Sequence, residues 1–295
     1  MAFDPLAPFA ARAAALPRLG LGLSSEFGAA EHGLDPLALR RAHPRFAQFL
    51  EVGVDLERGI DATARAWCAA GWPTTHHFLD ANLEERESLS DAWLSAVRAQ
   101  AHELGAAWLC GDAGLWHLGP RDRGHGVLAP PILCADSARE MGENVRRMRE
   151  ATRLEVLPEN PPAQLYLGEL HLCDYFARVA DAADCGLLLD VAHLAIYQRA
   201  SRGAPLDGLD GYPLERVIEI HVAGASEFEH AGRRFVDDDH GPTPLADTWA
   251  ILAHVLPRAP RLRALVFECE RNAAHEVLPG FRRLERAWAD AARAG

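Results

Sequence analysis

Histidine and carboxylate residues recur at the ends of short apolar segments of this chain, where their side chains could bind divalent metal ions. The residues concerned are His76, His77, Glu159, Asp190, His193, His221, Asp238, His240 and Glu268. An isolated buried carboxylate is costly to desolvate, whereas carboxylates and imidazoles that share a cation compensate one another. The spacing Asp238-Asp239-His240 forms a D-x-H arrangement whose outer side chains could converge on one cation.

Single polar residues at strand ends are often helix caps or ordinary hydrogen-bonding groups, and we interpret His77 and His230 in this way. The others form the expected set of metal ligands: His76, Glu159, Asp190, His193, His221, Asp238, His240 and Glu268. Nitrogen and oxygen donors without thiolates favour iron, manganese or zinc. The set exceeds what one six-coordinate ion can use, so we expect two or three ions, bridged by Glu159 or Glu268.

Eight short apolar segments alternate with segments of helical periodicity, a pattern typical of parallel strands connected by helices. The expected strands are 18–24, 47–54, 74–80, 106–111, 153–158, 185–191, 216–223 and 263–269. The expected helices are 36–44, 60–71, 84–104, 137–151, 168–183, 207–215, 243–256 and 274–293. This order predicts a single α/β domain over residues 1–295, a (β/α)8 TIM barrel, with a doubly wound open sheet as the alternative. The active site of such a barrel lies at the carboxyl ends of its strands, and the Gly/Pro-rich connection 112–136 could cover it.

The composition excludes several classes of protein. All 30 cationic residues are arginine, so enzymes that need a lysine amine are excluded, including Schiff-base, pyridoxal-phosphate and P-loop enzymes. The 42 acidic residues give a net charge of −12, which disfavours nucleic-acid binding. No apolar stretch of about 18 residues and no secretion signal are seen, so we expect a cytoplasmic protein without membrane contact. The six cysteines contain no C-x-x-C pair, which argues against a disulfide framework or a thiolate zinc site.

Several motifs occur in the order found in one known family. They are ENPP (159–162), the segment 175–197 with LLLDVAH, EIHVAG (219–224), the D-x-H at 238–240 followed by TW (248–249), and FECE (267–270). Weaker matches are GLGL (20–23), FLEV (49–52) and LAPP (128–131). With these motifs the chain resembles the DUF692 family of multinuclear non-haem iron-dependent oxidases, which includes the methanobactin biosynthesis enzyme.

The resemblance implies a TIM barrel that holds two or three irons and uses dioxygen to oxidise cysteine, or neighbouring atoms, of a ribosomally made precursor peptide. A small partner protein that binds the leader peptide is often involved. The matched metal positions are His76, Glu159, Asp190, His221, Asp238, His240 and Glu268. We expect catalytic roles for Glu159, Asp190 and His240.

Two positions depart from the family pattern. Gly111-Asp112-Ala113-Gly114 stands where family members typically have Ser-Asp/Glu-His-Leu, so Ala113 replaces an expected histidine. His193 stands at a ligand-like asparagine and adds a stronger nitrogen donor. Asp112, His117 or His125 are candidates to fill the missing position, and the number of irons stays open.

Two other functions remain open. A divalent-metal sugar isomerase or epimerase of the xylose-isomerase type would need only paired carboxylates such as Glu159 and Glu268. A non-catalytic peptide-binding pseudoenzyme would follow if Ala113 had disabled the site. The acidic net charge favours a basic leader peptide or partner, and the oligomeric state stays open.

Overall fold

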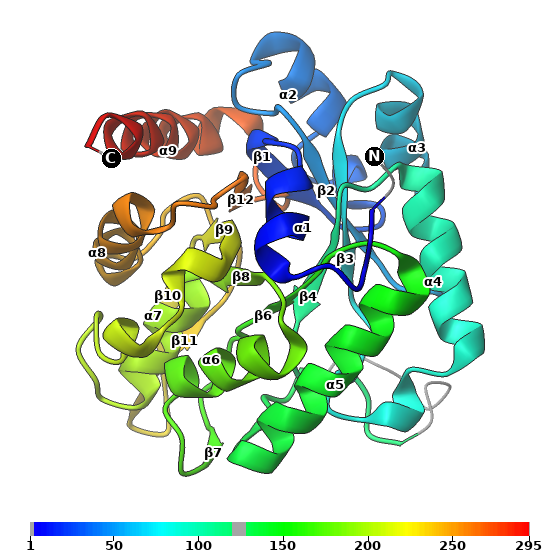
Figure 1. The fold of residues 1–295 in the computed structure, drawn as a ribbon. Coiled ribbons are helices and arrows are strands. Elements are labelled where there is room, and N and C mark those ends of the chain that lie inside the picture. Colours follow the sequence, from blue (N-terminus) through cyan, green and yellow to red (C-terminus); the bar gives the residue numbers. More distant parts are fainter. Residues whose placement is uncertain (1–2, 120–127, 295) are drawn as a thin grey trace.

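Eight parallel strands close into one barrel in the computed structural model, which describes residues 3–119 and 128–294 (Figure 1). The strand order around the barrel is β1-β12-β9-β8-β6-β4-β3-β2. The strands are β1 (Gly20–Ser25), β2 (Leu50–Val54), β3 (Thr74–Phe78), β4 (Leu109–Asp112), β6 (Val156–Glu159), β8 (Leu187–Asp190), β9 (Val217–Ala223) and β12 (Ala264–Glu268). This closure confirms the predicted TIM barrel and rules out the open sheet.

Helices surround the barrel, as Figure 1 shows. They are α2 (Pro36–Ala42), α3 (Ala62–Ala69), α4 (Asp91–Leu104), α5 (Ala135–Thr152), α6 (Leu172–Ala183), α7 (Val191–Ala200), α8 (Ala246–Val255) and α9 (Ala274–Ala294). Helix α4 shows how the sequence sets their limits. The Ser90 hydroxyl accepts a hydrogen bond from the Trp93 N–H at the amino end, and Gly105, with φ of 65°, ends the helix in the left-handed region.

The segment after β8 differs from the sequence-based prediction in its helices. Helix α7 follows β8 directly, because the Asp190 carboxylate accepts a hydrogen bond from the His193 N–H and so begins the helix. The predicted helix 207–215 is wrong: the segment holds only the 3-10 turns η4 (Leu209–Gly211) and η5 (Leu214–Arg216), the second after Pro213.

Four further strands of the described residues lie outside the barrel. Strands β10 (Ser226–His230) and β11 (Arg233–Asp237) form an antiparallel hairpin after β9 that was not predicted from the sequence. Strands β5 (Ile132–Leu133) and β7 (Leu167–Gly168) form a small parallel pair. Both additions belong to connections that follow barrel strands at their carboxyl ends. They therefore build up the end of the barrel where an active site is expected.

The amino end of the barrel is closed by the short helix α1 (Phe9–Ala15), which lies across the centre of the view in Figure 1. Phe9 and Ala13 of this helix belong to one buried apolar cluster with interior residues of the strands. The interior members are Phe49, Trp108, Cys110, Leu157, Leu188, Ile218, Ala264 and Val266. The amino-terminal half of the barrel is thus mainly a packed apolar core, and the carboxylates and imidazoles that line a cavity gather toward the carboxyl ends of the strands.

A buried ion pair fixes α1 to the barrel. The Arg12 Nε lies 2.6 Å from Glu155 Oε2, and its Nη2 donates to Glu155 Oε1 at 3.2 Å. The Gly186 N–H also donates to Glu155 Oε1.

Among the helices of the described residues, none combines the length and the apolar composition that a membrane-spanning helix needs.

We expect Arg12→Met to lower the free energy of unfolding by about 3–5 kcal/mol, because it leaves the Glu155 carboxylate buried without its cation. Urea unfolding followed by circular dichroism measures this loss. The double variant Arg12→Met/Glu155→Gln should recover a large part of it, since no uncompensated charge remains. A single variant as stable as the wild type would contradict this role of the pair.

Candidate metal centre

The carboxyl ends of the barrel strands surround a cavity of about 270 Å³. Its lining is rich in carboxylates and imidazoles from separate strands and from the loops that follow them. These residues are Glu26, Glu51, His77, Asp112, His193, Asp238, His240, Glu268 and Glu270. Seven of the eight predicted metal ligands lie in or directly against this group, and His76 does not.

The structure places the two adjacent histidines of β3 on opposite faces of the strand. The His77 ring points into the barrel mouth, where its Nε2 lies 2.9 Å from Glu159 Oε2. Side chains alternate across a strand, so His76 faces the outside of the barrel, toward helix α4. The Thr74 hydroxyl, on the same face as His76, donates to the Leu104 carbonyl of that helix. Burial there lowers the pKa of His76 to about 4.

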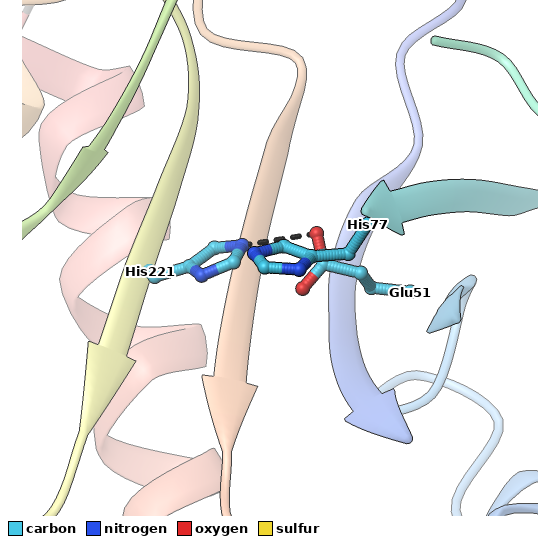
Figure 2. A group of neighbouring side chains, drawn as sticks. All are labelled: Glu51, His77 and His221. Atoms are coloured by element: carbon cyan, nitrogen blue, oxygen red, sulfur yellow. Dashed lines mark hydrogen bonds and ion pairs between the residues drawn. The ribbon is translucent and has the colours of Figure 1, made fainter. Parts of the chain in front are cut away.

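His221 of β9 lies at the centre of the group. Its Nε2 is 3.1 Å from Glu51 Oε2, and its Nδ1 is 3.3 Å from both Glu159 Oε1 and Glu268 Oε1. Figure 2 shows that Glu51, His77 and His221 point toward one another from three strands, and the two rings are stacked with centroids 5.9 Å apart. The negative charges of Glu51, Glu268 and Glu159 raise the pKa of His221 well above its usual value despite its burial.

His193, in the first turn of α7, connects a second set of carboxylates. Its Nε2 lies 3.0 Å from Asp238 Oδ2 and 3.7 Å from Asp190 Oδ2. Its Nδ1 lies 2.9 Å from the Asn160 carbonyl oxygen and 3.6 Å from Asp112 Oδ1 and Glu159 Oε1. The Asn160 carbonyl accepts the Nδ1 proton, which leaves Nε2 facing the carboxylates.

The D-x-H arrangement predicted from the sequence converges at the rim of the mouth. His240 Nε2 lies 3.4 Å from Asp238 Oδ2 and 4.0 Å from Glu268 Oε2. Its Nδ1 lies 2.6 Å from Glu270 Oε1, and the other oxygen of Glu270 accepts a hydrogen bond from the Ser24 hydroxyl at 2.8 Å. His240 has a φ of 50°, a left-handed conformation that a non-glycine residue adopts at some cost in strain.

Buried atoms without hydrogen-bond partners show what the mouth can hold. Within the described residues, these side-chain atoms of the cluster have none: Asp112 Oδ1, Glu159 Oε1, Asp190 Oδ2, His221 Nδ1, Asp238 Oδ1 and Glu268 Oε2. Unpaired buried oxygens are costly, and here they surround a shared space. Groups drawn from His77, Asp112 and Glu159, and from Glu159, Asp190 and His193, bring ligand atoms within 4.8 Å of one another. Oxygen and imidazole donors of this kind fit more than one divalent ion.

Four members of the group that lines the mouth were not assigned as metal ligands from the sequence and were not among the candidates for the missing histidine: Glu26, Glu51, Glu270 and His77. Glu51 lies in FLEV (49–52), near the start of β2 and inside an apolar segment, so the signal of a polar residue at a strand end does not identify it. Glu270 is the last residue of FECE (267–270), two residues beyond Glu268. His77 was interpreted as an ordinary hydrogen-bonding residue, as was His230, which is exposed on β10.

Asp112, His117 and His125 were the candidates to take the place of the missing histidine, and the structure places the first two in different surroundings. Asp112 lies in the mouth, where burial and the charge of Glu159 raise its pKa to about 7. His117 lies beside Ser88 and Gly119, and its backbone contacts Asn82, so it is not part of the cluster. His125 lies outside the described residues. Ala113 is fully buried in the apolar core around the barrel.

We expect His77→Gln to weaken Fe²⁺ binding by at least about tenfold, since it removes a nitrogen donor from the mouth. His76→Gln is the matched control, because it changes the neighbouring histidine on the other face of the same strand. Anaerobic Fe²⁺ titration followed by metal analysis compares the two. Weaker binding in His76→Gln, with wild-type binding in His77→Gln, would contradict the assignment.

Comparisons with known proteins show the fold and the family of this chain. The structure of a xylose isomerase-like TIM barrel protein from Mycobacterium smegmatis in complex with magnesium is similar over 95% of this chain and 98% of its own, with a TM-score of 0.59. The two sequences are 12% identical, so this similarity shows the fold alone. The UPF0276 protein of Anaeromyxobacter sp. (strain Fw109-5) is 25% identical over 66% of this chain and 67% of its own length. That of Caulobacter vibrioides is 32% identical over 39% and 41%. The family model "RiPP precursor modification enzyme MbnB/TglH/ChrH" matches residues 20–291, so the chain belongs to this family.

Proposed function

We propose that this protein is a multinuclear non-haem iron-dependent oxidase that uses dioxygen to modify cysteine, or adjacent atoms, of a ribosomally made precursor peptide. The observation that carries the proposal is the continuous cluster of carboxylates and imidazoles with unpaired buried atoms at one barrel mouth. Membership of the MbnB/TglH/ChrH family supports a peptide substrate. We place the reaction in the cytoplasm, where precursor peptides are synthesised, with a small leader-binding protein as partner.

The proposed ligands are the seven predicted residues of the mouth together with His77, Glu51 and Asp112. Glu159 is the proposed bridge, because its Oε1 lies near His221 and His193 while its Oε2 contacts His77. Bound iron would supply a site that lowers the pKa of a substrate thiol and can pass electrons to dioxygen.

The protein's own residues orient these donors. The Asn160 carbonyl fixes the ring of His193, and Glu270 fixes that of His240 by contacting its Nδ1. Such outer contacts set which ring nitrogen faces the ions. Asp238 and His240 have side chains that are 14% exposed, against 1% for Glu159 and 0% for Asp190. A substrate would therefore contact Asp238 and His240 first, whereas Glu159 and Asp190 would bind the metal ions from deeper in the barrel.

The mouth is also shielded from water on one side. Trp116 and Leu128, which flank the part of the long connection outside the described residues, line the cavity with Pro162. The Trp116 indole N–H donates to the Asp112 carbonyl, which holds this wall against the end of β4. An apolar wall beside charged donors strengthens their interaction with a bound substrate.

A divalent-metal isomerase or epimerase is the second candidate. One observation favours it: Glu159 and Glu268 both lie 3.3 Å from His221 Nδ1, so two carboxylates face one space as proton transfer requires. A non-catalytic peptide-binding protein is the third, and it predicts peptide binding with little iron.

We expect protein purified anaerobically with ample Fe²⁺ to hold about two or three irons per chain by metal analysis and Mössbauer spectroscopy. With dioxygen and a cysteine-containing precursor peptide, it should change the mass of that peptide. Glu159→Gln should abolish the change by removing the bridging carboxylate. Glu169→Gln, which alters an exposed carboxylate of a mouth loop, is the control and should retain activity.

Fewer than about one iron per chain would contradict the oxidase. Activity of the Mn²⁺-loaded protein on a sugar without dioxygen would instead establish the isomerase. Tight peptide binding with little iron would establish the non-catalytic alternative.

A further inference from the structure

A second concave region lies beside the metal centre and has the opposite charge. Two adjoining hollows of about 380 and 600 Å³ lie between the carboxyl end of α7 and the β10–β11 hairpin. Four arginines line them, together with Gln164, Phe235 and Glu227. We call this region the arginine pocket and define it by Arg199, Arg202, Arg233 and Arg234.

Three of these arginines are available to a ligand. Arg199 contacts Glu227 and lies 2.6 Å from Asp247 Oδ2, so its charge is largely used. The side chains of Arg202, Arg233 and Arg234 are exposed and have no ion pair or hydrogen bond within the described residues. Glu227 is the only carboxylate among the described residues that line the two hollows. A chain with a net charge of −12 thus gathers unpaired positive charge in one place.

Three segments of the chain lead from the metal mouth to the arginine pocket. The connection after β6 places Pro162 in the mouth and Gln164 in the arginine pocket, and two residues span at most about 7 Å. The Gln164 side-chain amide donates to the Val236 carbonyl of β11. Strand β11 then leads from Arg233 and Arg234 in the pocket to Asp238 in the mouth. Helix α7 likewise runs from the metal centre to Arg199.

The chemistry of the pocket indicates its ligand. Guanidinium groups bind carboxylates through paired charge-assisted hydrogen bonds. The volume of the two hollows is larger than a single small anion needs and suits a short segment of peptide. Leu165 and Leu167, directly after Gln164, are 71% and 61% exposed, and Phe228 of the hairpin is 49% exposed. Acidic side chains with apolar neighbours would match both features.

We propose that the arginine pocket binds an acidic, apolar segment of the precursor peptide, outside the part that is modified, and so anchors the peptide beside the metal mouth. This inference rests on the proposed function, because it assigns the segment to the substrate. The net charge alone favours a basic leader, whereas the local distribution of charge favours an acidic segment. Anchoring raises the effective concentration of the reacting cysteine at the mouth.

A binding experiment on the full chain tests the inference without using activity. The probe is a fluorescein-labelled peptide of alternating Glu and Leu, compared by anisotropy with the same peptide carrying Gln for Glu. Wild type should bind the Glu peptide about tenfold more tightly, as charge-assisted hydrogen bonds require. Arg233→Gln/Arg234→Gln should lose this preference. Arg282→Gln/Arg286→Gln, which removes the same charge from exposed positions of α9, should retain it.

The inference would be overturned if wild type bound the two peptides equally, or if the α9 control lost the preference for the Glu peptide as fully as Arg233→Gln/Arg234→Gln. Displacement of the Glu peptide by inorganic phosphate at equal concentration would also overturn it, because that result would indicate a small-anion site. Iron content, measured on the same preparations, separates this outcome from that of the proposed function. A preserved peptide preference in protein that holds no iron refutes only the oxidase. Peptide oxidation without any preference refutes only the anchoring site.

Discussion

Electrostatic repulsion among buried carboxylates is the constraint on which the site depends. The mouth gathers Glu51, Asp112, Glu159, Asp190, Asp238, Glu268 and Glu270 against four imidazoles, of His77, His193, His221 and His240. Negative charge remains in excess even when every imidazole is protonated. Burial accordingly raises the pKa of Asp112 to about 7 and that of Asp190 well above its usual value. Divalent ions would remove this cost and displace those protons, so the energetics of the cluster favour a metal centre.

The fold holds these charges together because its other end is a rigid apolar core. Phe9 and Ala13 of α1 seal the amino end, and the Arg12–Glu155 pair fixes that helix to the barrel. Barrel closure then brings strand ends from nearly the whole chain to one rim, where the strand register places Asp190 beside His221 and Asp112 beside Glu159. The connections that follow these strands carry the arginine pocket, so the candidate metal centre and the proposed peptide-binding site lie beside each other.

The barrel, and most of the side chains that gather at the candidate site, could be predicted from the sequence, because both depend on local signals. Apolar segments marked the strands, and polar residues at their ends marked the mouth, as Glu159, His221 and Glu268 show. The choice between His76 and His77 could not be made in this way, because adjacent residues on a strand differ only in the face they occupy, and tertiary packing sets that face. The helix after Asp190 was missed because its first turn continues an apolar strand pattern. The β10–β11 hairpin was missed because its exposed, charged strands lack an apolar pattern.

Anomalous X-ray scattering at the iron edge, recorded from crystals of the anaerobically loaded protein, tests the central claim most directly. The account predicts at least two iron positions within the mouth, one near Glu159 and His221 and one near His193 and Asp238. Iron bound outside the mouth, or no iron position among these residues in protein saturated with Fe²⁺, would contradict it.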